Sequence, residues 1–198
     1  FQNMKLSLPE FYDDDEIINQ TASVLANRGI VAWFQGRSEF GPRALGARSF
    51  LADPRDDKIR DEINKKIKKR EMFRPFAPSI MFEKQSEYFD LNLFSPYMNI
   101  VSKVKKNKHE IIPAVIHSDN TSRIHSVSYD FNQKYYSLLK RFYEITGVPV
   151  LLNTSFNIQE PIVNSPEDAI KTFFESDVDL LVIGNYFCDK EWKLKQIK

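Results

Sequence analysis

The stretch QKYYSLLKRFYEITGVPVLLNTSFN, residues 133–157, predicts a helix that leads directly into a buried strand. The apolar residues of one helical face recur at three- and four-residue spacing: Tyr136, Leu139, Phe142 and Tyr143. Gly147 is a typical helix stop, and the apolar run VPVLLN then predicts a strand that ends in polar residues. Because α/β sheets usually bind ligands at the carboxyl ends of strands, this stretch predicts both the fold class and the place of a site.

Helical and extended patterns alternate on both sides of this stretch. The expected helices are 14–28, one capped by Asp53 with Ile59, Ile63 and Ile67 as its apolar stripe, 84–90, and one capped by Ser165. The expected strands are IVAWF at 30–34, SFLAD at 49–53, FAPSIMF at 76–82, SPYMNIVSKV at 95–104, PAVIHS at 113–118, RIHSVS at 123–128 and DLLVIGNYF at 179–187. This order predicts one α/β domain over residues 1–198, a twisted mixed sheet flanked by helices, with residues 1–12 as an extension or linker.

Composition excludes several classes of protein. With 28 basic and 27 acidic residues the formal charge is +1, so no global charge favours nucleic acid or an anionic membrane. Cys188 is the single cysteine, which excludes an internal disulfide and multi-cysteine metal sites. No apolar run is long enough to span a membrane, and we expect a cytoplasmic protein. Because the chain begins with Phe1, we expect a piece of something longer.

Three arginines lie within twelve residues of a glycine-rich segment, GRSEFGPRALGARS at 36–49. Glycines allow the backbone to approach a ligand, and the guanidinium groups of Arg37, Arg43 and Arg48 can bind phosphate or carboxylate oxygens. The alternative is a surface loop whose arginines pair with neighbouring carboxylates such as Glu39. The segment lacks the GxxxxGK[ST] pattern of a P-loop.

A further arginine, Arg123, lies among small polar residues in HSDNTSRIHSV at 117–127, which also suits an oxyanion. The two histidines of this segment, His117 and His125, are eight residues apart and form a poor metal set, so a structural or hydrogen-bonding role is favoured.

Neutral donors and acceptors follow the strand VPVLLN, namely Asn153, Thr154, Ser155 and Asn157. They can bind phosphates or a carbamoyl group without adding charge. For Asn157 a turn that satisfies its own backbone is a competing interpretation.

A basic run covers residues 55–74. Its nine lysines and arginines are Arg55, Lys58, Arg60, Lys65, Lys66, Lys68, Lys69, Arg70 and Arg74. The favoured interpretation is a solvated helix face, and a nucleic-acid patch is the alternative.

Several segments together resemble a known family. GRSEFGPRALGARSFLADPR, REMFRPFAPSI, SPYM, HSDNTSRIHSV and GVPVLLNTSFN with the following EPIV occur in this order. Over roughly residues 20–187 the chain is similar to the C-terminal, YrdC-like domain of the NodU-type O-carbamoyltransferases. This resemblance implies an α/β fold that binds ATP and carbamoyl phosphate and forms a carbamoyl adenylate. A separate N-terminal, metal-binding domain would then transfer the carbamoyl group to an acceptor hydroxyl.

Matching positions in these motifs imply the site residues. Catalytic roles fall to Arg43, Arg48 and Arg123, and ATP or carbamoyl phosphate would bind to Arg37, Ser49, Arg74, Asn153, Thr154, Ser155 and Asn157. Mg²⁺ is expected to accompany the nucleotide, with no protein-bound metal in this domain, no membrane partner and no nucleic-acid partner.

The sequence departs from the family pattern at two glycines. Family members commonly read DGTAR where this chain has DNTSR at 119–123, and NxxGEPIV where it has NIQEP at 157–161. Side chains at these places predict adjusted loops or weakened binding. They motivate an alternative function, a non-catalytic nucleotide- or RNA-binding module of the same fold.

Overall fold

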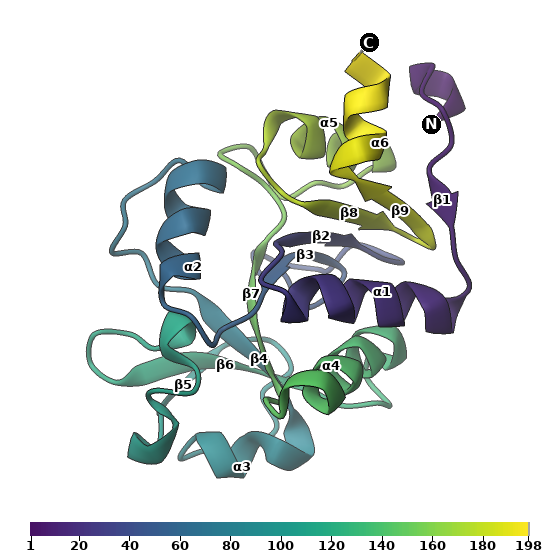
Figure 1. The fold of residues 1–198 in the computed structure, drawn as a ribbon. Helices are drawn as coiled ribbons and strands as arrows, with labels where there is room; N and C mark the ends of the chain where they lie inside the picture. The colour runs from purple at the N-terminus through teal and green to yellow at the C-terminus, as the bar shows by residue number, and fades with distance from the viewer. Residues whose placement is uncertain (198) are drawn as a thin grey trace.

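A nine-stranded mixed sheet organises residues 1–197, the part of the chain that the computed structural model describes (Figure 1). The strands are β1 (Glu10–Phe11), β2 (Val31–Phe34), β3 (Arg48–Ala52), β4 (Ala77–Met81), β5 (Ile100–Lys103), β6 (Thr121–Val127), β7 (Val150–Ser155), β8 (Leu180–Ile183) and β9 (Tyr186–Asp189). The helices are α1 (Asp14–Ala26), α2 (Lys58–Glu62) with a π-helical continuation over Ile63–Ile67, α3 (Gln85–Tyr88), α4 (Gln133–Thr146), α5 (Pro166–Glu175) and α6 (Lys190–Ile197).

The strand order is β1-β9-β8-β2-β3-β7-β4-β6-β5. Only the β2–β8 and β4–β6 pairs are parallel among the described strands, and β7 runs antiparallel to both of its neighbours. Asn153 of β7 pairs with Leu51 of β3 on one side and Ala77 of β4 on the other. The carboxyl end of β7 therefore meets the amino ends of β3, β4 and β6 at one edge of the sheet.

Helices cover both faces of the sheet. α1 and α4 lie side by side on one face, and α5 and α6 lie on the other beside β8 and β9 (Figure 1). Every residue of β2, β3, β4 and β8 is buried, as are Leu139 and Phe142 of α4. Because each large apolar side chain contributes ~1.5–3 kcal/mol on burial, this core holds the carboxyl end of β7 in place.

Local signals explain the helix ends. Asp13 and Glu16 form the reciprocal capping box expected at the start of α1, and Ser165 caps α5 in the same way. Gly147 ends α4 in the left-handed conformation with φ of 73°. These helices and the α/β class were predicted correctly.

Two expected strands are wrong. Residues 113–115 of PAVIHS form a 3₁₀ turn, because Pro113 occupies the first helical position and has no N–H for a strand partner. DLLVIGNYF forms two antiparallel strands, β8 and β9, because Gly184 takes a φ of 58° and turns the chain back.

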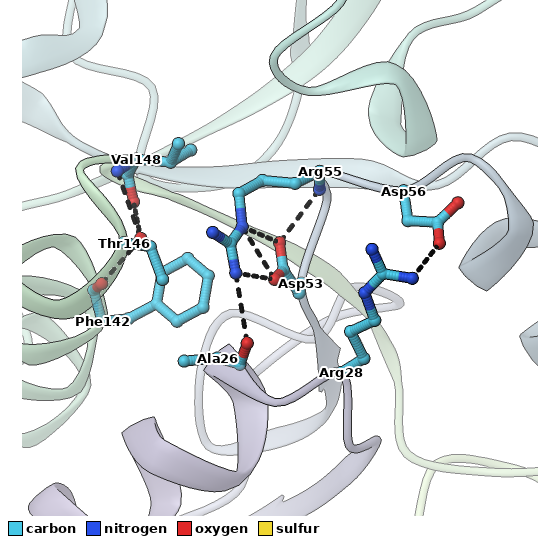
Figure 2. Close-up of polar contacts among 8 residues, drawn as sticks. All are labelled: Ala26, Arg28, Asp53, Arg55, Asp56, Phe142, Thr146 and Val148. Carbon is cyan, nitrogen blue, oxygen red and sulfur yellow. Dashed lines mark hydrogen bonds and ion pairs between the residues drawn. The ribbon is translucent and has the colours of Figure 1, made fainter.

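The sequence predicted that Asp53 caps a helix, and this prediction is wrong, because α2 begins five residues later, at Lys58. The buried carboxylate of Asp53 instead accepts hydrogen bonds from the backbone N–H and the Nε of Arg55, and it pairs with Nη2 of Arg55 at 2.5 Å (Figure 2). Arg55 also donates to the carbonyl of Ala26 at 3.1 Å and lies 5.9 Å from the ring of Phe142. The aspartate therefore ties β3 to α1 and α4.

Candidate functional site

A cavity of about 110 Å³ opens where β7 ends, and three guanidinium groups from distant segments line it. Arg43 comes from the glycine-rich loop, Arg70 from the segment after the π-helical turn and Arg123 from β6. Asn153, Thr154 and Ser155 supply the polar floor; we call this space the arginine cavity.

The charges of the arginine cavity lack a counterion. No acidic residue is among its lining residues, and none of the three arginines forms an ion pair within residues 1–197. Burial, and then the positive charge of Arg43, lower the pKa of Arg123. The Nε of Arg123 is buried without a hydrogen-bond partner. A cluster of this kind stabilises a bound anion.

Asn153, another residue that lines the cavity, has a buried side-chain oxygen without a hydrogen-bond partner. Its Nδ2 donates to the carbonyl of Ala44 at 3.1 Å and to the hydroxyl of Ser79 at 2.9 Å, while its Oδ1 is buried and unpartnered. Burial lowers the pKa of His125 to about 3, so this imidazole is neutral, and its Nδ1 lies 2.8 Å from Ser79 Oγ. Because the carbonyl of Ala44 can only accept, the amide nitrogen of Asn153 is the atom that faces it, and Oδ1 is left without a partner.

A second, more open cavity of about 400 Å³ adjoins the first, with Arg70 and Ser155 lining both. Lys68 lies at its base, 2% exposed, and its Nζ is surrounded by oxygens of Ser155 and Asn157. Nζ is 2.5 Å from the carbonyl of Ser155 and 2.8 Å from both the carbonyl and the Oδ1 of Asn157. Burial, followed by the charge of Arg70, lowers the pKa of Lys68 to about 7.

Asn64, fully buried on the π-helical turn, holds the segment that carries Arg70. Its Oδ1 accepts from Arg70 Nε at 2.7 Å, and its Nδ2 donates to the carbonyls of Met72 and Arg74 at 3.3 and 3.0 Å. The turn itself is closed by the bond from Lys68 N to the carbonyl of Ile63. π-helical turns are frequent at functional sites, and this one directs two cations toward the cavities.

The structure brings together some of the expected site residues and separates others. Arg43, Arg123, Asn153, Thr154 and Ser155 line the arginine cavity, and Arg74 and Asn157 line the second cavity. Arg74 is exposed there and pairs with Glu71 at 2.9 Å.

Arg37, Arg48 and Ser49 line neither cavity. The guanidinium of Arg48 is buried against the Phe34 ring at 3.5 Å and donates to the carbonyls of Gln35, Gly36 and Ala47. Ser49 is buried in β3, where its hydroxyl accepts from Gly46 N, and Arg37 is exposed. Arg48 and Ser49 therefore shape the loop that carries Arg43.

Sequence reasoning missed Lys68 and Arg70 by treating the basic run as a solvated face. Four of its cations pair with carboxylates: Arg55, Arg60, Lys66 and Arg74. Lys68, Lys69 and Arg70 line the cavities, so the exposed remainder is Lys58 and Lys65. The available signal was position, because Lys68 directly follows Ile67 of the buried stripe.

Among residues 1–197 no cluster of three His, Cys, Asp or Glu side chains could hold a metal ion. His117 contacts the Thr121 hydroxyl at 3.3 Å and His125 contacts Ser79, as the sequence interpretation of hydrogen-bonding histidines expects. Each helix within the described range falls short of the length and apolar character needed to cross a membrane.

Residues 22–190 match the family model described as "Carbamoyltransferase C-terminus". The chain is 47% identical to nodulation protein NolNO of Sinorhizobium fredii over 180 residues, which are 89% of this chain and 26% of that protein. It is 37% identical to nodulation protein U of the same species over 140 residues, 71% of this chain and 25% of that protein. The chain thus spans about a quarter to a third of the length of such curated relatives.

Solved structures share the fold. Full-length HypF in its phosphate- and nucleotide-bound form superposes with a TM-score of 0.58 at 20% identity, over 89% of this chain and 22% of HypF. Sua5 of P. abyssi, complexed with L-threonine, gives a TM-score of 0.61 at 14% identity, over 91% of this chain and 50% of Sua5. E. coli YciO gives a TM-score of 0.58 at 18% identity, over 90% of this chain and 82% of YciO. These likenesses confirm the expected YrdC-like α/β fold.

Proposed function

Since the chain belongs to the carbamoyltransferase family and matches its C-terminal part, we propose that it binds ATP and carbamoyl phosphate and forms a carbamoyl adenylate. The family match establishes that the chain is a carbamoyltransferase C-terminal domain. Its substrates and the adenylate intermediate are what we propose.

The composition of the arginine cavity carries this proposal. Arginine side chains are donors only, so Arg43, Arg70 and Arg123 suit the oxygens of a phosphate. Asn153, which lines the same cavity, has an unsatisfied acceptor in its buried Oδ1, and a phosphate ester dianion has no hydrogen to donate to it. A carbamoyl group offers an NH₂ donor together with oxygens, so carbamoyl phosphate or carbamate satisfies both kinds of group.

The reaction balances with one water. The bond between the carbamoyl group and its phosphate is cleaved by water, which releases inorganic phosphate and leaves carbamate. A carbamate oxygen then forms a bond to the α-phosphorus of ATP, the bond from that phosphorus to the bridging oxygen breaks, and pyrophosphate leaves. The arginines stabilise the charge that spreads over the phosphoryl oxygens as these bonds change.

Lys68, with the adjoining second cavity, adds a cation whose charge depends on pH near neutrality. Its ammonium group already donates hydrogen bonds to Ser155 and Asn157. It therefore attracts a bound anion through its positive charge, without direct contact, and it orients these two side chains. Mg²⁺ arrives with the nucleotide and supplies charge neutralisation on its phosphates. Transfer of the carbamoyl group to an acceptor hydroxyl falls to the N-terminal, metal-binding domain implied by the family.

Calorimetric titration with ATP and with carbamoyl phosphate, together with a pyrophosphate-release assay, tests this proposal. We expect saturable binding of both ligands and pyrophosphate release that requires both of them. Arg43→Ala should reduce turnover strongly. Absence of binding by either ligand at millimolar concentration would exclude the catalytic function for this chain, and full turnover by Arg43→Ala would exclude the role of that arginine.

A non-catalytic nucleotide-binding module is the second candidate. The observation that favours it is Asn120, which has a φ of 62° where the family commonly has glycine and so places a side chain on a left-handed turn. This candidate predicts ATP binding without pyrophosphate release, and the same assay separates the two.

A further inference from the structure

A third cavity, of about 710 Å³, adjoins the arginine cavity at Pro75, which lines both. It is lined by Arg60, Met72, Phe73, Pro75, Ile116 and the 117–120 turn, and we call it the Phe73 cavity. The arginine cavity also adjoins the second cavity, because Arg70 and Ser155 line both. The Phe73 cavity is therefore next to the three guanidinium groups of the arginine cavity.

The wall of the Phe73 cavity is apolar and exposed. Phe73 is 82% exposed and Met72 is 42% exposed, although both lie on the short segment between Arg70 and Arg74. A phenylalanine left in water forgoes most of the free energy that burial provides, so stacking on a flat apolar partner would stabilise the bound state. An aromatic ring next to a cationic cavity is the combination that binds a base and its phosphates.

The rim of the Phe73 cavity offers hydrogen-bond acceptors. The hydroxyl of Thr121 donates to Asp119 Oδ1 at 2.7 Å, so it can only accept from His117 Nδ1, 3.3 Å away. The His117 ring is neutral at pH 7, because burial lowers its pKa, and Nε2 is then its acceptor atom. Nε2 and the Asp119 carboxylate suit an exocyclic amino group.

We propose that the Phe73 cavity binds the base of an aminopurine nucleotide, with the ring stacked on Phe73 and the phosphates directed past Pro75 into the arginine cavity. This inference rests on the proposed function, since it requires a nucleotide whose phosphates occupy the arginine cavity. It assigns to Phe73 and His117 the recognition of the base, which the arginines cannot distinguish.

Titration calorimetry of the whole chain with ATP, inosine triphosphate and inorganic tripolyphosphate tests the assignment. Tripolyphosphate keeps the charges of ATP without a base, and inosine triphosphate replaces the exocyclic amine by a carbonyl. We expect the wild-type protein to bind ATP about tenfold more tightly than tripolyphosphate, with an intermediate affinity for inosine triphosphate. Phe73→Ala should weaken the binding of ATP about tenfold and leave the affinity for tripolyphosphate unchanged within about twofold.

Phe11→Ala is the matched control, because Phe11 is another largely exposed phenylalanine, 65% against 82% for Phe73, and lies on the edge strand β1. It should leave all three affinities unchanged. Equal binding of ATP and tripolyphosphate by the wild-type protein would overturn the inference while leaving the anion site intact. Equal weakening of both ligands by Phe73→Ala would also overturn it. Failure of the wild-type protein to bind either ligand would overturn the inference and the proposed function together.

Discussion

The two ends of β3 hold arginines in opposite electrostatic settings. Beyond its carboxyl end, Arg55 is neutralised by the buried carboxylate of Asp53 and is tied to α1 (Figure 2). At its amino end, beside the end of β7, the arginine cavity gathers three guanidinium groups with no carboxylate. The first setting stabilises the fold from within, whereas the second leaves positive charge that only a bound ligand can neutralise.

This comparison predicts that removing charge has opposite consequences at the two ends. At Asp53 it should cost stability and leave anion binding intact. In the arginine cavity it should cost anion binding and leave stability intact.

Asp53→Ala should have the largest effect, because it leaves Arg55 without its carboxylate. Breaking a buried pair costs ~3–5 kcal/mol, and since Arg55 is 37% exposed we expect about 2–3 kcal/mol of unfolding free energy to be lost. Urea denaturation measures it. Glu62→Ala, which breaks the exposed pair with Lys66, is the control and should cost less than about 0.5 kcal/mol. Equal losses in the two variants would contradict the structural role of Asp53.

Arg123→Ala should leave the unfolding free energy unchanged or slightly raised, because it removes a cation that burial and Arg43 disfavour. Sulfate affinity, measured by calorimetry, should fall about tenfold to a hundredfold, as expected for a lost charge-assisted hydrogen bond worth ~1.5–3 kcal/mol. Arg141→Ala, on α4 and paired with Glu144, should change neither quantity. A marked loss of stability in Arg123→Ala would show that this arginine stabilises the fold, as Arg55 does.

Sulfate binding should weaken as pH rises through the pKa of Lys68, about 7, because the ammonium group then loses its charge. Sulfate remains a dianion throughout, so a fall of roughly tenfold between pH 6 and pH 8.5 reports the lysine. Lys68→Met should abolish this slope, whereas Lys65→Met, at an exposed lysine that lines neither cavity, should keep it. A slope that persists in Lys68→Met would assign the titration to another group.

The same lysine gives a signed prediction for stability. Its pKa is about 7 when folded and near the ordinary 10.5 when unfolded, so between these values the unfolded chain binds one more proton. The contribution of Lys68 to the unfolding free energy therefore rises with pH over this window and is least favourable below pH 7. Comparing the pH dependence of urea midpoints for wild type and Lys68→Met measures it.

Asn64→Ala should have the smallest effect on sulfate binding, about threefold, because it acts through the position of Arg70. The decisive readout is the double variant. In an Arg70→Ala background the further change Asn64→Ala should not alter sulfate affinity, since the group it positions is already absent. Additive losses would show that Asn64 supports the cavity in some other way.

Much of the fold could be predicted from local patterns, because apolar spacing and caps act over a few residues. The capping boxes of α1 and α5 and the glycine that ends α4 are signals of this kind. The division of DLLVIGNYF into two strands depends on the φ of Gly184, where one glycine inside an apolar run did not suffice to predict a turn.

The site was predictable only in part. Arg43, Arg123 and Asn153 line the arginine cavity. They lie in segments whose polar residues interrupt apolar runs, and this pattern identified them as candidate site residues. Lys68 is surrounded by oxygens from residues 87 and 89 positions later in the chain, so its burial has no local signal. Arg48 shows the converse: its sequence context matches that of Arg43, yet tertiary packing places it on Phe34 and backbone carbonyls.

Urea unfolding of wild type and of the double variant Arg43→Ala, Arg123→Ala, each with and without tripolyphosphate, tests the central claim most directly. Arg70 is kept, because its Nε is the partner of the buried Oδ1 of Asn64. Without anion the double variant should be at least as stable as wild type. Tripolyphosphate at a hundred times its wild-type Kd should stabilise wild type by ~2.7 kcal/mol and the variant much less. An anion-free double variant that unfolds well below wild type, or one that tripolyphosphate stabilises equally, would contradict the claim.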